Sequence, residues 1–123
     1  MKKETYETGL EGERLAERYL TEHKGMTCLA RRARNRGGEI DLVMLDGECV
    51  VFVEVKTRKT AGAGEGLQAV DARKQIRLTR AAELWLLSRP HPGEETRFDV
   101  VEIGPGGVLH VPNAFQPAGG LFY

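Results

Sequence analysis

Two carboxylates and an amine, on Asp41, Glu54 and Lys56, are the side chains of this sequence best suited to chemistry. The apolar run from Val50 to Val55 is typical of a central strand covered on both faces. Charges on such a strand need partners or an ion, because an unpaired buried charge is costly. Since Mg²⁺ or Mn²⁺ prefers oxygen ligands, Asp41, Glu54 and the carbonyl of Val55 are predicted to hold a metal. Lys56 would then hold or activate the attacking water.

The hairpin around Asp46-Gly47 decides whether these groups meet. An Asp-Gly pair between two β-rich runs is typical of a two-residue hairpin loop. With that loop Asp41 pairs with Phe52, and Glu54 lies diagonal to Asp41 at ~7–8 Å between backbones. Asp41, Glu54 and Lys56 then share one face of the sheet. The competing interpretation is an ordinary surface ion pair between Glu54 and Lys56 on a half-exposed strand.

Turn and cap signals divide the chain into the elements that position this hairpin. The predicted elements are a helix from Thr8 to about Lys24, strands at 26–34, Glu39–Leu45 and Glu48–Thr57, a helix from about Leu67 to Leu87, and strands Arg97–Ile103 and Val108–Val111. The order αβββαββ predicts an α/β fold with a mixed central β-sheet flanked by α-helices. Residues 1–123 are expected to form a single domain, with 113–123 as a loosely packed tail.

Two charged residues interrupt the apolar stripes of the predicted helices. Glu13 falls on the stripe of the first helix, and Lys74 lies four residues from both Val70 and Leu78 on the second. Glu13 either points at a site in the core or follows the preference for acids near a helix start. Lys74 either snorkels to solvent or reaches the carboxylates or a bound phosphate.

Arginines occur near the same strands, where a nucleic acid would need them. The candidate phosphate-binding residues are Lys74, Arg58, Arg73, Arg77, Arg34 and Arg36. The competing interpretation is a solvated face with ordinary ion pairs. Because 18 Lys and Arg balance 18 Asp and Glu, attraction to DNA must come from a local patch, which argues against a histone-like coating protein.

The composition excludes several other classes of protein. The chain has 123 residues, 41% of them apolar, which suits one packed domain without disulfides or a structural zinc. Its two cysteines form no Cys-x-x-Cys pair, and its three histidines stand apart from any ligand or nucleophile pattern. The glycines within residues 58–66 lack the spacing of a nucleotide-binding loop. Without a signal peptide or a run of ~20 apolar residues, we expect a cytoplasmic protein with no membrane partner.

Four segments carry a resemblance to a known family. They are GEIDLV (Gly38–Val43), FVEVKTR (Phe52–Arg58), Val70 with Lys74, and RFDVV (Arg97–Val101). With them the chain resembles the YraN (UPF0102-type) family of small bacterial proteins. That resemblance implies the restriction-endonuclease-like fold of PD-(D/E)XK nucleases and similarity to archaeal Holliday junction resolvases.

The same resemblance implies a role for each matching residue. Asp41 matches the first acid of the motif, Glu54 the second, Lys56 its lysine, and Glu13 the helix glutamate of the junction-resolvase branch. Ile40 stands where the motif name has proline. We therefore predict a Mg²⁺-dependent endonuclease acting on DNA, with branched DNA as a candidate substrate and a homodimer as a candidate assembly. The alternative is a nucleic-acid-binding module that keeps a nuclease-like fold without cleaving.

Overall fold

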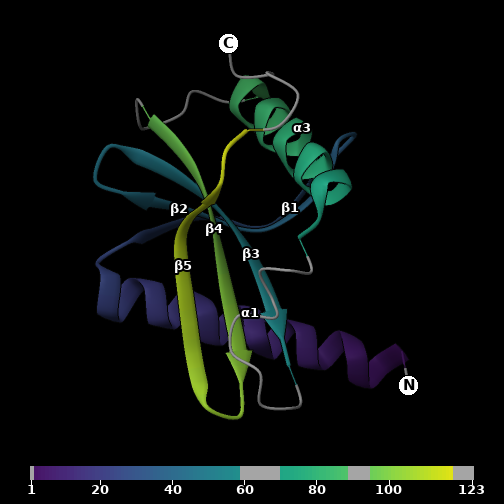
Figure 1. Ribbon diagram of the computed structural model, residues 1–123, viewed down its shortest axis with the longest axis vertical. Coiled ribbons are helices and arrows are strands. Elements are labelled where there is room, and N and C mark those ends of the chain that lie inside the picture. The colour runs from purple at the N-terminus through teal and green to yellow at the C-terminus, as the bar shows by residue number, and fades with distance from the viewer. Residues whose placement is uncertain (1, 59–69, 89–94, 118–123) are drawn as a thin grey trace.

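The computed structural model describes residues 2–58, 70–88 and 95–117, with side chains from Gly9 onward. Its elements are α1 (Lys2–Lys24), β1 (Thr27–Asn35), β2 (Gly38–Asp46), β3 (Cys49–Thr57), α3 (Ala72–Ser88), β4 (Glu95–Gly104) and β5 (Gly107–Phe115). The predicted order of helices and strands is confirmed (Figure 1). The glycines predicted to form a loop before the second helix all fall in 59–69, outside the described residues.

The five strands form one mixed sheet in the order β1-β2-β3-β4-β5. Neighbouring strands are antiparallel except β3 and β4, which run parallel from the pair Cys49 and Glu95 to the pair Thr57 and Ile103. A parallel pair needs a crossover connection, and α3 lies in the connection between these two strands. The predicted mixed sheet flanked by helices is therefore confirmed.

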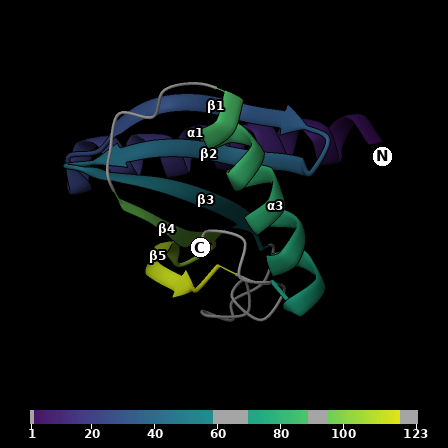
Figure 2. The ribbon, with the colours of Figure 1, turned by 90° about the horizontal axis from the view of Figure 1, so that it is seen from above.

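Each helix covers one face of the sheet with its own apolar cluster. On one face α3 packs Leu78 and Trp85 against strand residues that include Phe52 and Phe98. On the other face α1 packs Ala16 and Leu20 against the opposite side of the strands. Figure 2 shows α3 crossing the strands at a steep angle. The central strand β3 is therefore covered on both faces, as the alternation of its side chains requires.

Some element boundaries differ from the prediction for local reasons. α1 begins at Lys2 rather than Thr8. α3 begins at Ala72 rather than about Leu67, because the carboxylate of Asp71 accepts the backbone N–H of Lys74 at 2.9 Å and so caps the helix. β5 continues to Phe115, beyond the predicted end at Val111, and the ring of Phe115 stacks on Phe98 with 4.8 Å between centroids.

The predicted register of the β2–β3 hairpin is wrong by two residues. Asp46 pairs with Cys49 and Val43 with Phe52, so the loop consists of Gly47-Glu48. Of these two loop residues only Gly47 has a positive φ, of 62°, which is the pattern of a type II′ turn with glycine first. Because side chains alternate with period two, a shift of two residues leaves every side chain of the hairpin on its predicted face.

The turn between β1 and β2 is fastened to the backbone of α3. The amide of Asn35 donates to the carbonyl of Ala81 at 2.9 Å, and its oxygen accepts the N–H of Gly37 at 2.8 Å. A Cβ added to Gly37 would lie 2.7 Å from the nitrogen of Ala81, so only glycine fits this approach. The first hairpin and the crossover helix are therefore held in a fixed relation.

Within the described part of the chain, no helix combines the length and the apolar character needed to cross a membrane.

Candidate functional site

Asp41 lies where the hydrogen-bonded ladder between β2 and β3 comes to an end. The last ladder pair is Leu42 with Val53, and beyond it the backbone N–H of Val55 donates to the Asp41 carboxylate at 2.8 Å. Continuing the register puts Asp41 directly opposite Glu54 rather than diagonal to it. The two carboxylates therefore lie closer than the sequence predicted.

Burial and a second carboxylate oppose the ionisation of Asp41. Burial, followed by the charge of Glu54, raises the pKa of Asp41 from 3.8 to about 8, and Glu13 adds a smaller effect in the same direction. The hydrogen bond from Val55 opposes this rise. Without a cation nearby, Asp41 is therefore largely protonated at neutral pH.

Two lysines contact the same carboxylate oxygen of Glu54. Its side chain is only 5% exposed, and the ammonium of Lys56, two residues further along β3, lies 3.4 Å from Oε2. Lys74 reaches the same oxygen from α3 and makes the closer contact. The sequence left open whether Lys74 snorkels to solvent or reaches the carboxylates, and the structure has it in contact with Glu54.

The two lysines respond differently to this shared environment. Burial and the hydrogen bond with Lys74 lower the pKa of Lys56. Burial opposes ionisation of Lys74 as well, but the hydrogen bond and the charge of Glu54 outweigh it and raise the pKa of Lys74. Lys74 therefore keeps its proton more firmly, and Lys56 loses its proton more readily to give the neutral amine.

Glu13 stands at the border of the site on α1, held by a bidentate ion pair. The guanidinium of Arg32 donates to its two carboxylate oxygens at 2.8 and 3.1 Å. Arg32 has a φ of 45°, which a non-glycine residue adopts rarely, and it lies on β1 between the partners of Leu42 and Ile40. This local irregularity turns the Arg32 side chain toward the helix.

The donor set fits a hard cation that keeps several of its waters. Asp41 and Glu54 offer carboxylate oxygens, and Val55 directs its N–H to the Asp41 side of β3, where its carbonyl also points in regular strand geometry. In the described residues no group of three His, Cys, Asp or Glu side chains is arranged to hold a metal ion. A site here would therefore rest on two carboxylates, a carbonyl and water, which suits Mg²⁺ better than Zn²⁺.

The predicted phosphate-binding arginines divide into two groups. Arg34 is paired with Glu39 at 2.8 Å, and Arg58 lies 3.6 Å from Glu102. Arg36 at the β1–β2 turn and Arg73 and Arg77 on α3 are exposed, as Arg34 is. Because that turn is fastened to Ala81, these three arginines and Lys74 belong to one assembly of turn and helix.

A second polar cluster, which the sequence prediction missed, surrounds Asp99 on β4. This carboxylate is completely buried and accepts two hydrogen bonds from Arg97, at 2.9 and 3.1 Å, and one from the N–H of Asn113 at 2.9 Å. His110 places Nε2 2.7 Å from the same carboxylate. Burial alone would raise the pKa of Asp99, but His110, Arg97 and the Asn113 N–H together hold it below its usual range.

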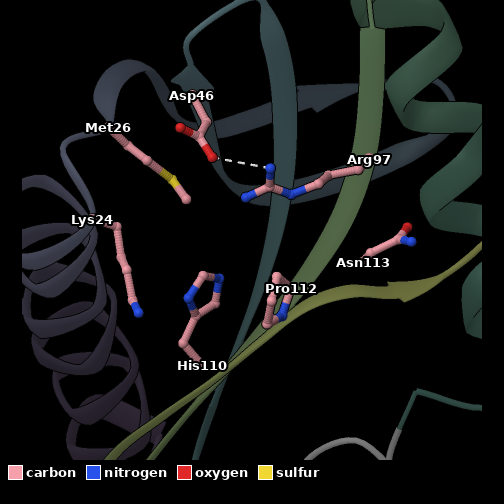
Figure 3. A pocket seen from close by; sticks show the side chains of 7 residues that line it. All are labelled: Lys24, Met26, Asp46, Arg97, His110, Pro112 and Asn113. Atoms are coloured by element: carbon pink, nitrogen blue, oxygen red, sulfur yellow. Dashed lines mark hydrogen bonds and ion pairs between the residues drawn. The ribbon is translucent and has the colours of Figure 1, made fainter.

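The Asp99 cluster borders a cavity at the end of β3 opposite to Glu54. The cavity has a volume of about 430 Å³, and Figure 3 shows Arg97 bonded to Asp46 across it, with His110 between Lys24 and Arg97. One sequence signal pointed here, namely an arginine and an aspartate two residues apart in an apolar strand, which therefore share a face. The contacts of Asp99 with His110 and Asn113 on β5 depend on a register irregularity between Phe98 and Val100, which the sequence pattern does not predict.

Comparison with known proteins identifies the family of the chain. A family model described as "Uncharacterised protein family UPF0102" matches residues 12–103, a range that includes all of the acidic and lysine residues of the site. The chain belongs to the UPF0102 family.

Relatives in this family resemble the chain over most of its length. A UPF0102 protein of Kineococcus radiotolerans is 48% identical over 111 residues, which cover 84% of this chain and 88% of that protein. A UPF0102 protein of Geobacter metallireducens is 43% identical over 114 residues, covering 89% and 93%. One of Bordetella avium is 44% identical over 98 residues, covering 80% and 68%.

Proposed function

We propose that this UPF0102 protein is a metal-dependent endonuclease of the restriction-endonuclease-like type, which hydrolyses phosphodiester bonds of DNA. The observation that carries the proposal is the convergence of Asp41, Glu54 and Lys56 at neighbouring strand ends. Two carboxylates in mutual contact are unfavourable for a stable core, because burial and repulsion keep one of them from ionising. Such a pair is useful where a divalent cation binds.

Each residue of the site has a part in this proposal. Asp41, Glu54 and the carbonyl of Val55 are the ligands for Mg²⁺ or Mn²⁺. The bound cation would lower the pKa of a coordinated water and offset charge on the phosphate oxygens. Lys56 holds the attacking water, and its lowered pKa favours the neutral amine that can accept a proton. Glu13 supports the site from α1, in a position fixed by Arg32.

The reaction is a hydrolysis that balances with water alone. A water oxygen forms a bond to phosphorus, and the bond from phosphorus to the departing sugar oxygen breaks. One proton leaves the water and one is taken up by the departing oxygen, so that one phosphate end and one hydroxyl end result. The exposed side chains of Arg36, Arg73 and Arg77 would hold phosphates next to the site. In a homodimer, two such sites could act on two strands of a branched DNA.

The test is cleavage of labelled DNA by the full-length protein. Duplex, flap, single-stranded and four-way junction substrates are incubated with Mg²⁺ or with Mn²⁺. Wild type is compared with Asp41→Asn, Glu54→Gln and Lys56→Met, each expected to lose about 10²–10⁴-fold in rate. Asp46→Asn is the matched control for Asp41, because it makes the same change at the other end of β2, and it should keep most of the activity.

Two outcomes decide between cleavage and binding. Metal-dependent cutting by wild type that the three site variants lose, with circular dichroism unchanged, supports the nuclease and identifies its preferred substrate. Binding of DNA by wild type without cutting under either metal would replace the nuclease with a nucleic-acid-binding module on the same fold.

A further inference from the structure

Lys74 occupies a position next to Glu54 that it would have to vacate for a metal ion to bind there. Its ammonium contacts Oε2 of Glu54, the oxygen that Lys56 approaches at 3.4 Å. The charge of Asp41 also acts on Lys74, so the ammonium lies within the field of both carboxylates. In the metal-free protein this lysine supplies the positive charge that the carboxylate pair requires.

The helix fixes the backbone of Lys74, while its side chain is partly exposed to solvent. Asp71 caps α3 by accepting the Lys74 N–H at 2.9 Å, and the side chain of Gln75 donates to the carbonyl of Val70 at 3.0 Å. The Lys74 side chain is 32% exposed, whereas that of Glu54 is 5% exposed. A lysine has four rotatable carbon bonds, so its ammonium can leave Glu54 for the surface without movement of the helix.

Beyond the capping carboxylate of Asp71, the charges in the first turns of α3 are opposite to those that a helix prefers. The first turn carries no acidic residue and the last turn no basic one. The basic residues Arg73, Lys74 and Arg77 instead lie near the start of α3. Cations near a helix N-terminus are unfavourable, because the helix dipole is positive there. Glu54 offsets this cost for Lys74, and a phosphate would offset it equally well once Glu54 is occupied by a cation.

We propose that Lys74 is an exchangeable counter-ion of the carboxylate pair, which leaves Glu54 when a divalent cation binds and then pairs with a substrate phosphate. This inference rests on the proposed metal site. It adds a coupling between the binding of the metal ion and the binding of DNA. A cation bound to Asp41 and Glu54 repels the ammonium of Lys74. The released ammonium is then available to pair with a substrate phosphate. Metal and DNA therefore favour each other's binding by an equal factor.

The exchange predicts that removing the lysine strengthens metal binding in the absence of DNA. Mn²⁺ is titrated into the full-length protein, and free Mn²⁺ is followed by electron paramagnetic resonance. Lys74→Gln is expected to bind Mn²⁺ at least tenfold more tightly than wild type, since no resident ammonium has to leave. Lys74→Arg keeps the charge and should stay within about threefold of wild type. Lys74→Met keeps the apolar stem and serves as a second neutral variant if Lys74→Gln folds poorly.

Lys24→Gln is the matched control for the loss of a positive charge. Lys24 lies at the end of α1, beside the cavity at the opposite end of β3, so its charge is largely screened from the site. This variant should change Mn²⁺ affinity by less than about twofold. Circular dichroism and thermal unfolding establish that each variant is folded.

The outcomes separate this inference from the proposed function. Tighter Mn²⁺ binding by Lys74→Gln and Lys74→Met, and not by Lys24→Gln, supports the exchange. Equal or weaker binding by both neutral variants overturns it, while measurable binding by wild type leaves the metal site standing. Absence of saturable Mn²⁺ binding by wild type and by every variant overturns the exchange together with the metal-dependent nuclease.

Discussion

Asp41→Asn should make the metal-free protein more stable at neutral and alkaline pH. Asparagine has nearly the shape of aspartate, and its side-chain oxygen can still accept the N–H of Val55, now 2.8 Å from the carboxylate. Its amide can donate to Glu54, the carboxylate that opposes ionisation of Asp41. Where Asp41 would be ionised, the substitution therefore replaces a repulsive contact with a hydrogen bond, and it leaves the packing unchanged.

The magnitude follows from the pKa of Asp41. Burial and the charge of Glu54 raise this pKa from 3.8 to about 8 in the folded protein. A group with a raised folded pKa contributes stability that is fully present below the unfolded value, here near pH 4, and lost as pH rises through about 8. At ~1.4 kcal/mol per pKa unit the loss approaches about 6 kcal/mol above pH 8. Water entry and side-chain relaxation reduce it, so we expect a gain of about 1–3 kcal/mol for Asp41→Asn at pH 8.

The assay is urea unfolding of wild type and Asp41→Asn between pH 4.5 and 8.5, with metal removed by a chelator. The two proteins should have similar free energies of unfolding at the acidic end and diverge as pH rises. Asp46→Asn is the control, because it loses the 3.0 Å ion pair with Arg97 and should be slightly less stable than wild type.

Addition of Mg²⁺ provides a second readout from the same samples. Wild type should gain stability in proportion to metal binding, while Asp41→Asn should gain little. The reasoning about the carboxylate pair is refuted if Asp41→Asn is less stable than wild type at pH 8, or if the difference between them does not depend on pH.

Three further predictions concern the fold, each checked by urea unfolding at pH 7. Phe98→Ala should cost about 3–5 kcal/mol, because the ring is 1% exposed at the centre of one core cluster. Asp99→Asn should cost about 3–5 kcal/mol, because Arg97 keeps its charge and loses its buried partner; a loss below 1 kcal/mol would show that the ion pair is not needed. Gly37→Ala should cost about 1–3 kcal/mol, since the new Cβ would lie 2.7 Å from the nitrogen of Ala81, and an unchanged midpoint would contradict this close approach.

The sequence predicted the convergence of Asp41, Glu54 and Lys56 even though it misplaced the hairpin loop. The reason is the period of a strand: a register error of two residues preserves the face of every side chain, whereas an error of one would have moved Glu54 to the opposite face. The loop was misplaced because both Asp46-Gly47 and Gly47-Glu48 are acceptable two-residue turns, and the choice depends on pairing along the whole ladder.

Features that depend on contacts between distant segments could not be predicted. The pairing of Arg58 with Glu102 needs the parallel register of β3 and β4, and the ion pair of Arg32 with Glu13 needs an unusual backbone angle on β1. The sequence proposed Arg58 as a phosphate ligand, and it gave no sign of the pairing with Glu102, because an arginine at the end of β3 looks the same in sequence with or without a partner. Long-range pairing, rather than local pattern, decides these roles.

The parallel pairing of β3 and β4 has a consequence for the synthesis of this protein. The hairpins joining β1, β2 and β3 close over short loops, so this part of the sheet can form as soon as it has been made. β4 follows only after α3, and until it arrives the side of β3 that will pair with it has unsatisfied backbone groups. β3 holds the buried run from Val50 to Val53, so the most apolar strand is an open edge throughout that interval. The nascent chain is therefore most exposed to aggregation between the completion of β3 and the docking of β4.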